Sequence, residues 1–257
     1  MGLSNYELVL LDNLIYLDEI TMATEKSDNV GQIVHRLLYA DGSTIPGTGT
    51  IQTDCIDKRD GKDKCMMDIE EWKQVLLAIE ADPTLCSLKI HDVVDAGDNG
   101  FRAATFISDA TAENVIIFRG TSSPNEWIDN GQGGYSLQTE NQKKALDYVN
   151  NIDIVNNNRF IVSGHSKGGN LAQYATLFAT DTIIDKCLSF DGQGFSQELI
   201  ETEDYQEAIE KNGENLYMVS STGDFVNVLF NAAVPDLHKM YVQANDVGGN
   251  IMEYKAA

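Results

Sequence analysis

The sequence is short of basic residues. Its 257 residues include 18 lysines and arginines against 40 aspartates and glutamates, which gives a formal net charge of −22 at pH 7. A surface of this charge repels nucleic acids and anionic membranes, and no local cluster of Lys or Arg overrides it. The charge balance therefore excludes a nucleic-acid partner and favours a small neutral or zwitterionic molecule as ligand.

Long hydrophobic runs are also missing. The apolar residues 8–11 are soon followed by Asp12, Asp18 and Glu19, and no basic region precedes them. This pattern fits neither a signal peptide nor a membrane span. We expect a protein without an integral membrane segment that is cytoplasmic, or one from which a leader has been removed. The sequence does not predict an oligomeric state.

The cysteines follow no metal-binding or redox pattern. None of the four, Cys55, Cys65, Cys86 and Cys187, belongs to a CxxC pair or has a histidine at ligand spacing. Free thiols are therefore expected, and no metal or other cofactor is implied. Cys55 and Cys65 flank a charged, glycine-containing loop, so a disulfide between these two is the alternative.

The first third of the chain is predicted to be mostly helical. Apolar residues recur at helical spacing in segments 6–20, 30–38 and 67–80. Residues 41–64 are rich in Gly, Thr, Asp and Lys, and this composition predicts a long loop. We therefore expect residues 1–87 to form a helical N-terminal portion.

The rest of the chain, residues 88–257, has the pattern of an α/β core. Two strand-like runs within 101–118 are separated by a short polar segment, which predicts a hairpin. Strand-like and helical segments then alternate, and residues 238–254 are interpreted as a hairpin at the sheet edge. This alternation predicts a mainly parallel sheet with helices on both faces. The length fits one domain, residues 1–257.

A strand-like run ends abruptly in Gly-His-Ser-Lys-Gly at residues 164–168, and a helical segment follows. Ser166 is then expected at a cramped turn from strand to helix, where glycines at 164 and 168 let the two backbones pass closely. The Lys167 N–H at the helix start would face an oxyanion formed on attack, and the helix dipole adds to this effect. The context predicts a nucleophilic serine; an incidental serine in a glycine-rich turn is the alternative.

A serine nucleophile needs a base, and the base needs an acid that orients it. In α/β-hydrolases the acid and then the histidine follow the serine along the chain. Asp191 and Asp224 both follow strand-like runs, at the sheet edge that presents the active site. We favour Asp224 and keep Asp191 as the alternative acid. His238 alone among the four histidines follows the acid and is the candidate base; a surface or packing role is its alternative.

A second oxyanion donor is expected where the apolar run 115–118 ends. Arg-Gly-Thr follows this run and leaves the Thr121 N–H and hydroxyl at the carboxyl end of the strand. Residues 122–135 contain three glycines and the apolar Trp127, and we interpret them either as a lid or as a surface loop. The acidic segment 195–211 either shapes the pocket or covers the sheet.

These motifs together resemble the class 3, or fungal-type, lipases. The resemblance is carried by four motifs. They are Phe-Arg-Gly-Thr at 118–121 with Trp127 and Asp129, the nucleophile elbow (the turn from strand to helix that holds Ser166) at 164–172, Asp-Gly-Gln-Gly-Phe at 191–195, and Gly-Asp-Phe-Val at 223–226. An uncharacterised bacterial lipase-like family with a GHSKGGN elbow is more similar still. The resemblance covers roughly residues 101–254 and implies an α/β-hydrolase fold. It implies Ser166 as nucleophile, Asp224 as acid, Thr121 and Lys167 as oxyanion donors, and a lid around Trp127.

The sequence departs from these families at the base. In class 3 lipases a histidine placed like His238 is not the base, and the bacterial relatives tend to have one in the terminal hairpin, where this chain has Ile-Met-Glu-Tyr at 251–254. Two functions follow. The first is a serine ester hydrolase of lipase, esterase or lysophospholipase type, which acts through an acyl-enzyme on a lipid or other carboxylic ester with Ser166, His238 and Asp224. The second is a catalytically impaired lipase-fold module that binds an acyl ligand or a protein partner.

Overall fold

The structure, a computed structural model, describes most of the chain. The described residues are 2–21, 28–39, 69–96, 100–109, 113–121, 129, 131–153, 159–224 and 226–243. Several predictions fall outside them: the loop at 41–64, the Cys55–Cys65 alternative, most of the candidate lid at 122–135, and the second arm of the terminal hairpin at 251–254.

The described strands form one sheet in chain order. They are β1 (Lys89–Asp95), β2 (Arg102–Ile107), β3 (Asn114–Phe118), β4 (Arg159–His165), β5 (Ile183–Phe190), β6 (Leu216–Ser221) and β7 (Lys239–Val242). The pairings β1–β2 and β2–β3 are antiparallel, so the predicted hairpin is present. From β3 to β7 every neighbouring pair is parallel. The sheet is therefore mainly parallel, as the sequence predicts.

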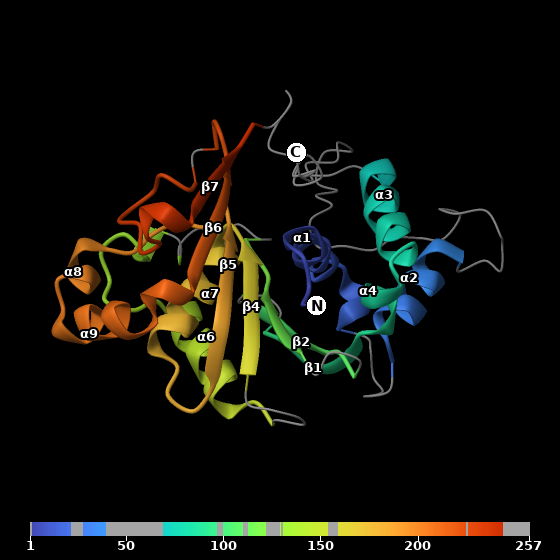
Figure 1. Ribbon diagram of the computed structural model, residues 1–257, viewed down its shortest axis with the longest axis horizontal. Coiled ribbons are helices and arrows are strands. Elements are labelled where there is room, and N and C mark those ends of the chain that lie inside the picture. The colour runs from blue at the N-terminus through green and yellow to red at the C-terminus, as the bar shows by residue number, and fades with distance from the viewer. Residues whose placement is uncertain are drawn as a thin grey trace.

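Helices cover both faces of this sheet (Figure 1). One layer contains α1 (Asn5–Leu14), α2 (Val30–Tyr39), α3 (Ile69–Glu80) and α4 (Pro83–Ser87). The other contains α6 (Glu140–Asn151), α7 (Lys167–Phe178), α8 (Gln197–Ile200) and α9 (Glu203–Asn212). Short 3₁₀ turns lie at Asp18–Ile20, Gly213–Asn215 and Asp236–His238.

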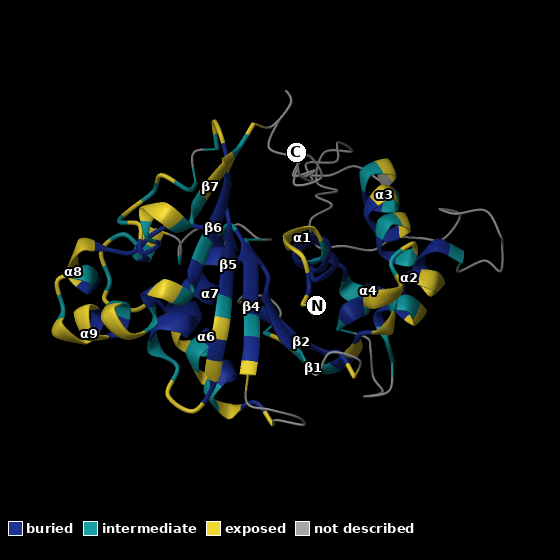
Figure 2. Ribbon diagram, in the orientation of Figure 1, coloured by how far each residue is buried: buried dark blue, intermediate teal, exposed yellow. Residues whose placement is uncertain are grey.

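Each helix layer has its own hydrophobic core against the sheet. Leu188, Phe190 and Val219 pack with the N-terminal helices on one face. On the other face, Phe118 and Val162 pack with α6 and α7. Every residue of β2 and β3 is buried, because both faces are covered, and Figure 2 shows the strands as mainly buried.

Local signals set several helix boundaries. Ser4 and Glu7 form a capping box at the start of α1, which satisfies two of its N–H groups. Asp82 accepts the N–H groups of Thr84 and Leu85 and so caps α4. The sequence predicts only a helix end at Asp82–Pro83; the same two residues also begin the next helix, because proline is well suited to a first helical turn.

The segment 195–211 packs into the helix layer. The Phe195 and Tyr205 rings meet edge to face with their centroids 6.1 Å apart, and Phe195 also contacts Tyr174 of α7. Leu199, Tyr205 and Ala208 are buried in the core on that face. Of the two interpretations of this segment, these contacts support a cover over the sheet.

Candidate active site

Ser166 lies between β4 and α7 in a strained backbone conformation. Its φ is 55° and its ψ −119°, a region that L-residues rarely occupy. Its N–H donates to the Phe190 carbonyl at 2.8 Å, which ties the turn to the neighbouring strand β5. The residue is partly exposed. The strand, tight turn and helix expected around Ser166 are therefore present.

Two glycines make this turn possible. A Cβ at Gly168 would overlap the Phe118 carbonyl oxygen of β3, and one at Gly164 would overlap the Gly168 backbone. Because the obstacles are main-chain atoms, they cannot move aside as a flexible side chain would. The close passage of strand, turn and helix therefore requires hydrogen as the side chain at both positions.

The two predicted oxyanion donors lie beside this turn. Lys167 is the first residue of α7, where backbone N–H groups have no partner within the helix. Phe118 pairs with Gly164, and a Cβ at Gly120 would overlap the His165 carbonyl oxygen. Thr121, three residues after the end of β3, thus lies next to the elbow. The arrangement brings together Thr121, Lys167 and Ser166 at one edge of the sheet.

The two candidate acids also lie near each other, at the carboxyl ends of β5 and β6. Asp191 Oδ1 accepts the Ser221 N–H at 2.8 Å and the Asn227 side-chain amide at 3.4 Å. Asp224 Oδ2 accepts the N–H groups of Val226 and Asn227, each at 3.0 Å. Asn227 thus contacts both carboxylates. Asp191 is buried with φ 47°, whereas Asp224 is partly exposed.

Burial raises the pKa of Asp191 from 3.8 to about 7, against the stabilising Ser221 N–H, and the nearby charge of Asp224 adds to the rise. Between pH 4 and 7 the folded protein therefore holds a proton at Asp191 that the unfolded chain has released. Stability falls as pH rises through this window and is level above it, and the full shift is worth at most about 4 kcal/mol.

Replacing Asp191 by Asn should remove this pH dependence. Asn keeps the acceptor for Ser221, tolerates a positive φ and stays neutral at every pH. The free energy of unfolding of the variant minus that of wild type should therefore rise by roughly 2–4 kcal/mol from pH 4 to pH 8. Urea unfolding of both proteins at the two pH values measures this gain. An equal difference between them at both pH values would contradict the assignment.

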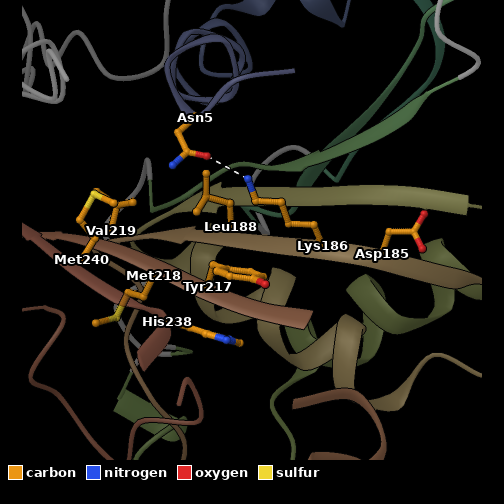
Figure 3. A pocket seen from close by; sticks show the side chains of 9 residues that line it. All are labelled: Asn5, Asp185, Lys186, Leu188, Tyr217, Met218, Val219, His238 and Met240. Carbon is orange, nitrogen blue, oxygen red and sulfur yellow. Dashed lines mark hydrogen bonds between the residues drawn. The ribbon is translucent and has the colours of Figure 1, made fainter. Parts of the chain in front are cut away.

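The candidate base His238 lies away from the elbow. It precedes β7, and its Nδ1 pairs with the Leu216 carbonyl at 3.0 Å, at the amino end of β6. Its ring stacks on the Tyr217 ring, with the two ring centroids 4.3 Å apart. Both rings line a pocket of about 450 Å³ that Lys186 and Asn5 also line (Figure 3). The strand spacing and rise put this ring roughly 15 Å from Ser166.

The assignment of His238 as the base is therefore corrected. The alternative, a packing role for His238, fits its contacts: the Leu216 carbonyl and the Tyr217 ring hold the His238 ring, and Glu214 lies 3.7 Å from its Nε2. The physical reason is the parallel direction of β6 and β7, which puts the residue before β7 at the amino edge of the sheet and not at the carboxyl edge.

The other histidines do not pair with Ser166 either. His91 Nε2 contacts the Asp153 carbonyl at 2.8 Å, and His35 Nδ1 lies 3.5 Å from Glu80 on the helices of the N-terminal portion. His165 is buried, and burial lowers its pKa to about 4, so the ring is neutral. All four histidines of the chain are described, and none forms a hydrogen bond with Ser166 in this arrangement.

The sequence interpretation missed the polar contacts that hold the first turns of α7, the helix that follows the elbow. Asn170 of α7 accepts the Gln142 side-chain amide at 2.9 Å and donates to the Gly194 carbonyl at 2.8 Å. The Lys167 ammonium pairs with Asp129 at 2.7 Å. An available signal was the position of Lys167 and Asn170 in a helix that the sheet must bury, since buried polar side chains need partners.

Two absences hold for the described residues. Among the helices in these ranges, none has the length and apolar character needed to cross a bilayer. Within the same ranges there is no group of three or more His, Cys, Asp or Glu side chains that could hold a metal ion.

The mainly parallel sheet, the helices on both faces and the strained serine after β4 define an α/β-hydrolase fold. Within this class, residues 84–256 match the model of the Mbeg1-like family. The chain belongs to the Mbeg1-like family. No curated protein matches it.

Solved structures of fungal lipases are similar to parts of the chain. One is the structure of a fungal lipase–inhibitor complex, which gave a model for interfacial activation in lipases. It has 18% identity over 55% of this chain and 60% of the lipase, and a TM-score of 0.40. Another is the Rhizomucor miehei lipase–propeptide complex, with 15% identity over 55% of this chain and 51% of that one, and a TM-score of 0.39. A third is a triacylglycerol lipase from Penicillium expansum, with 11% identity over 62% of this chain and 71% of the lipase, and a TM-score of 0.39. The chain thus covers less than two thirds of the first two.

Proposed function

We propose that this protein is a serine ester hydrolase that acts on a carboxylic ester through an acyl-enzyme at Ser166. The observation that carries the proposal is the strained backbone of Ser166 at the start of α7. Such strain persists only where the surroundings enforce it, and it is typical of a functional site. The negative charge of the protein favours a neutral or zwitterionic ester, lipids included.

In the proposed reaction, Ser166 Oγ attacks the ester carbonyl carbon and loses its proton to a base. The N–H groups of Thr121 and Lys167 stabilise the oxyanion, and its collapse expels the alcohol, which takes from the base the proton that Ser166 lost. Water then attacks the acyl-enzyme, releases the carboxylic acid and regenerates the serine. Asp224, with Asp191 as the alternative, is the proposed acid that would orient this base. In the described arrangement none of the four histidines forms the hydrogen bond with Ser166 that this base needs.

A second function is favoured by the position of His238. Because the His238 ring is held at the amino end of β6, no histidine in the described part of the chain forms a hydrogen bond with Ser166. A module with the same fold would then bind an acyl ligand or a protein partner without turnover. The two functions differ in whether Ser166 reacts.

Covalent labelling with a fluorophosphonate probe, read by intact mass, separates the two functions. The wild-type protein should gain one label, which peptide mapping places at Ser166, and Ser166→Ala should gain none. Since His238 lies far from Ser166, His238→Ala should label at a rate within about twofold of wild type. Hydrolysis of p-nitrophenyl esters with two to sixteen carbons in the acyl chain would then define the substrate range.

A folded wild-type protein that takes up no label would contradict the hydrolase and leave the binding module. Loss of labelling in folded His238→Ala would instead restore this histidine as the base, and would show that the region around β7 rearranges in the active protein.

A further inference from the structure

The Lys167 side chain forms an ion pair in the protein interior, directly behind the elbow. Its ammonium lies 2.7 Å from the Asp129 carboxylate, and the two side chains are only 3% and 12% exposed. By contrast, the side chains of the Arg159–Asp185 pair are 56% and 40% exposed. A buried charge must be paired, so Lys167 and Asp129 hold each other in place far more firmly than a surface pair does.

Asp129 also contacts the neighbouring helix. Its Oδ1 accepts the N–H of Asn141, the second residue of α6, at 3.3 Å. A single carboxylate therefore bridges the first turns of α6 and α7. The N-terminal end of a helix attracts negative charge, which favours this position for a carboxylate.

A second contact joins α6 and α7 close by: Nε2 of Gln142, the residue after Asn141, donates to Oδ1 of Asn170, three residues after Lys167, at 2.9 Å. The start of α7 is thus fixed from the side of α6 at two points. Lys167 immediately follows the strained Ser166, and anchoring the far end of its side chain limits rotation of its own backbone.

We propose that Asp129 is a positioning residue: through the Lys167 side chain and the first turn of α6, it keeps the Lys167 N–H directed at the oxyanion. This proposal rests on the proposed ester hydrolase. It assigns a role to the Lys167 side chain that is separate from the role of its backbone, and it places the residue that governs oxyanion stabilisation outside the elbow.

The deciding variant is the double substitution Asp129→Asn with Lys167→Met. It removes both charges, so no unpaired charge stays buried, and both replacements are similar in shape to the originals. With p-nitrophenyl butyrate as substrate, kcat should fall by about tenfold to a hundredfold while KM stays within about twofold, because the lost interaction acts only in the transition state. The thermal unfolding midpoint identifies variants that are folded at the assay temperature.

The exposed pair Arg159–Asp185 provides the matched control. The double variant Arg159→Met with Asp185→Asn removes an ion pair of the same kind from β4 and β5, and its kcat should equal that of wild type. A folded Asp129→Asn/Lys167→Met protein with wild-type kcat would overturn the proposal. So would a loss that the control variant shares.

Hydrogen exchange keeps the test independent of activity. In the Asp129→Asn/Lys167→Met protein, peptides that cover residues 163–172 should exchange at least about fivefold faster, whereas peptides from β1 to β3 should not change. If the wild-type protein takes up no fluorophosphonate, the proposed hydrolase fails, and exchange alone then decides whether Asp129 holds the elbow. Unchanged exchange at 163–172 would reject that role.

Discussion

Replacing Ser166 by glycine should abolish covalent labelling and ester hydrolysis and at the same time make the protein more stable. The hydroxyl is the proposed nucleophile, so its removal should lower kcat by at least about a thousandfold. Ser166 also has φ 55° and ψ −119°. Glycine adopts such a conformation without a steric penalty, and relief of the strain should add roughly 1–3 kcal/mol to the free energy of unfolding.

The variant Ser166→Ala separates the two effects. It also lacks the hydroxyl, but its Cβ keeps the strain, so it should be inactive without the gain in stability. Urea unfolding of the three proteins, together with intact-mass labelling, measures both quantities. Equal stability of the glycine and alanine variants would show that the backbone at Ser166 stores no strain.

Replacing Gly168 by alanine should have the largest effect on folding. The added Cβ would overlap the Phe118 carbonyl oxygen and contact the Arg119 backbone. Strand β3 cannot retreat from α7 without breaking its pairing with β4. We expect a loss of about 4 kcal/mol or more, since overpacking against main-chain atoms has no cheap relaxation.

Gly131→Ala is the matched control, because a Cβ at Gly131 would meet no atom within 4 Å. Its stability should stay within about 0.5 kcal/mol of wild type. Thermal and urea unfolding of both variants measure the difference. A Gly168→Ala protein as stable as Gly131→Ala would mean that strand and helix do not approach as closely as described.

Much of the fold follows from the sequence because its signals are local. Alternating strand-like and helical runs predict parallel pairing, and β3 to β6 follow this pattern with helices on both faces. Boundaries were less accurate where one residue has two roles. Asp82 and Pro83 end one helix and begin another, and the sequence pattern shows only the interruption.

The candidate site was predictable to the extent that strand direction fixes it. Thr121, Ser166, Asp191 and Asp224 all follow parallel strands, so they meet at the carboxyl edge of the sheet. His238 precedes β7, and the same rule places it at the opposite edge. The helix position of Lys167 indicates that its side chain needs a partner, but the sequence does not predict that this partner is Asp129, because 37 residues separate the two and no local pattern joins them.

The contacts of α1 bear on where a functional fragment of this protein can be cut. The family match begins at residue 84, yet Asp12 of α1 accepts the hydroxyl of Ser163 at 2.8 Å, three residues before the elbow serine. The Arg102 guanidinium, buried in β2, donates to carbonyls of residues 15 and 16 and pairs with Asp18. A fragment trimmed to residues 84–256 would leave this cation and the face of Leu188 and Phe190 in water. The segment that matches the family model therefore lacks part of the hydrophobic core of this protein.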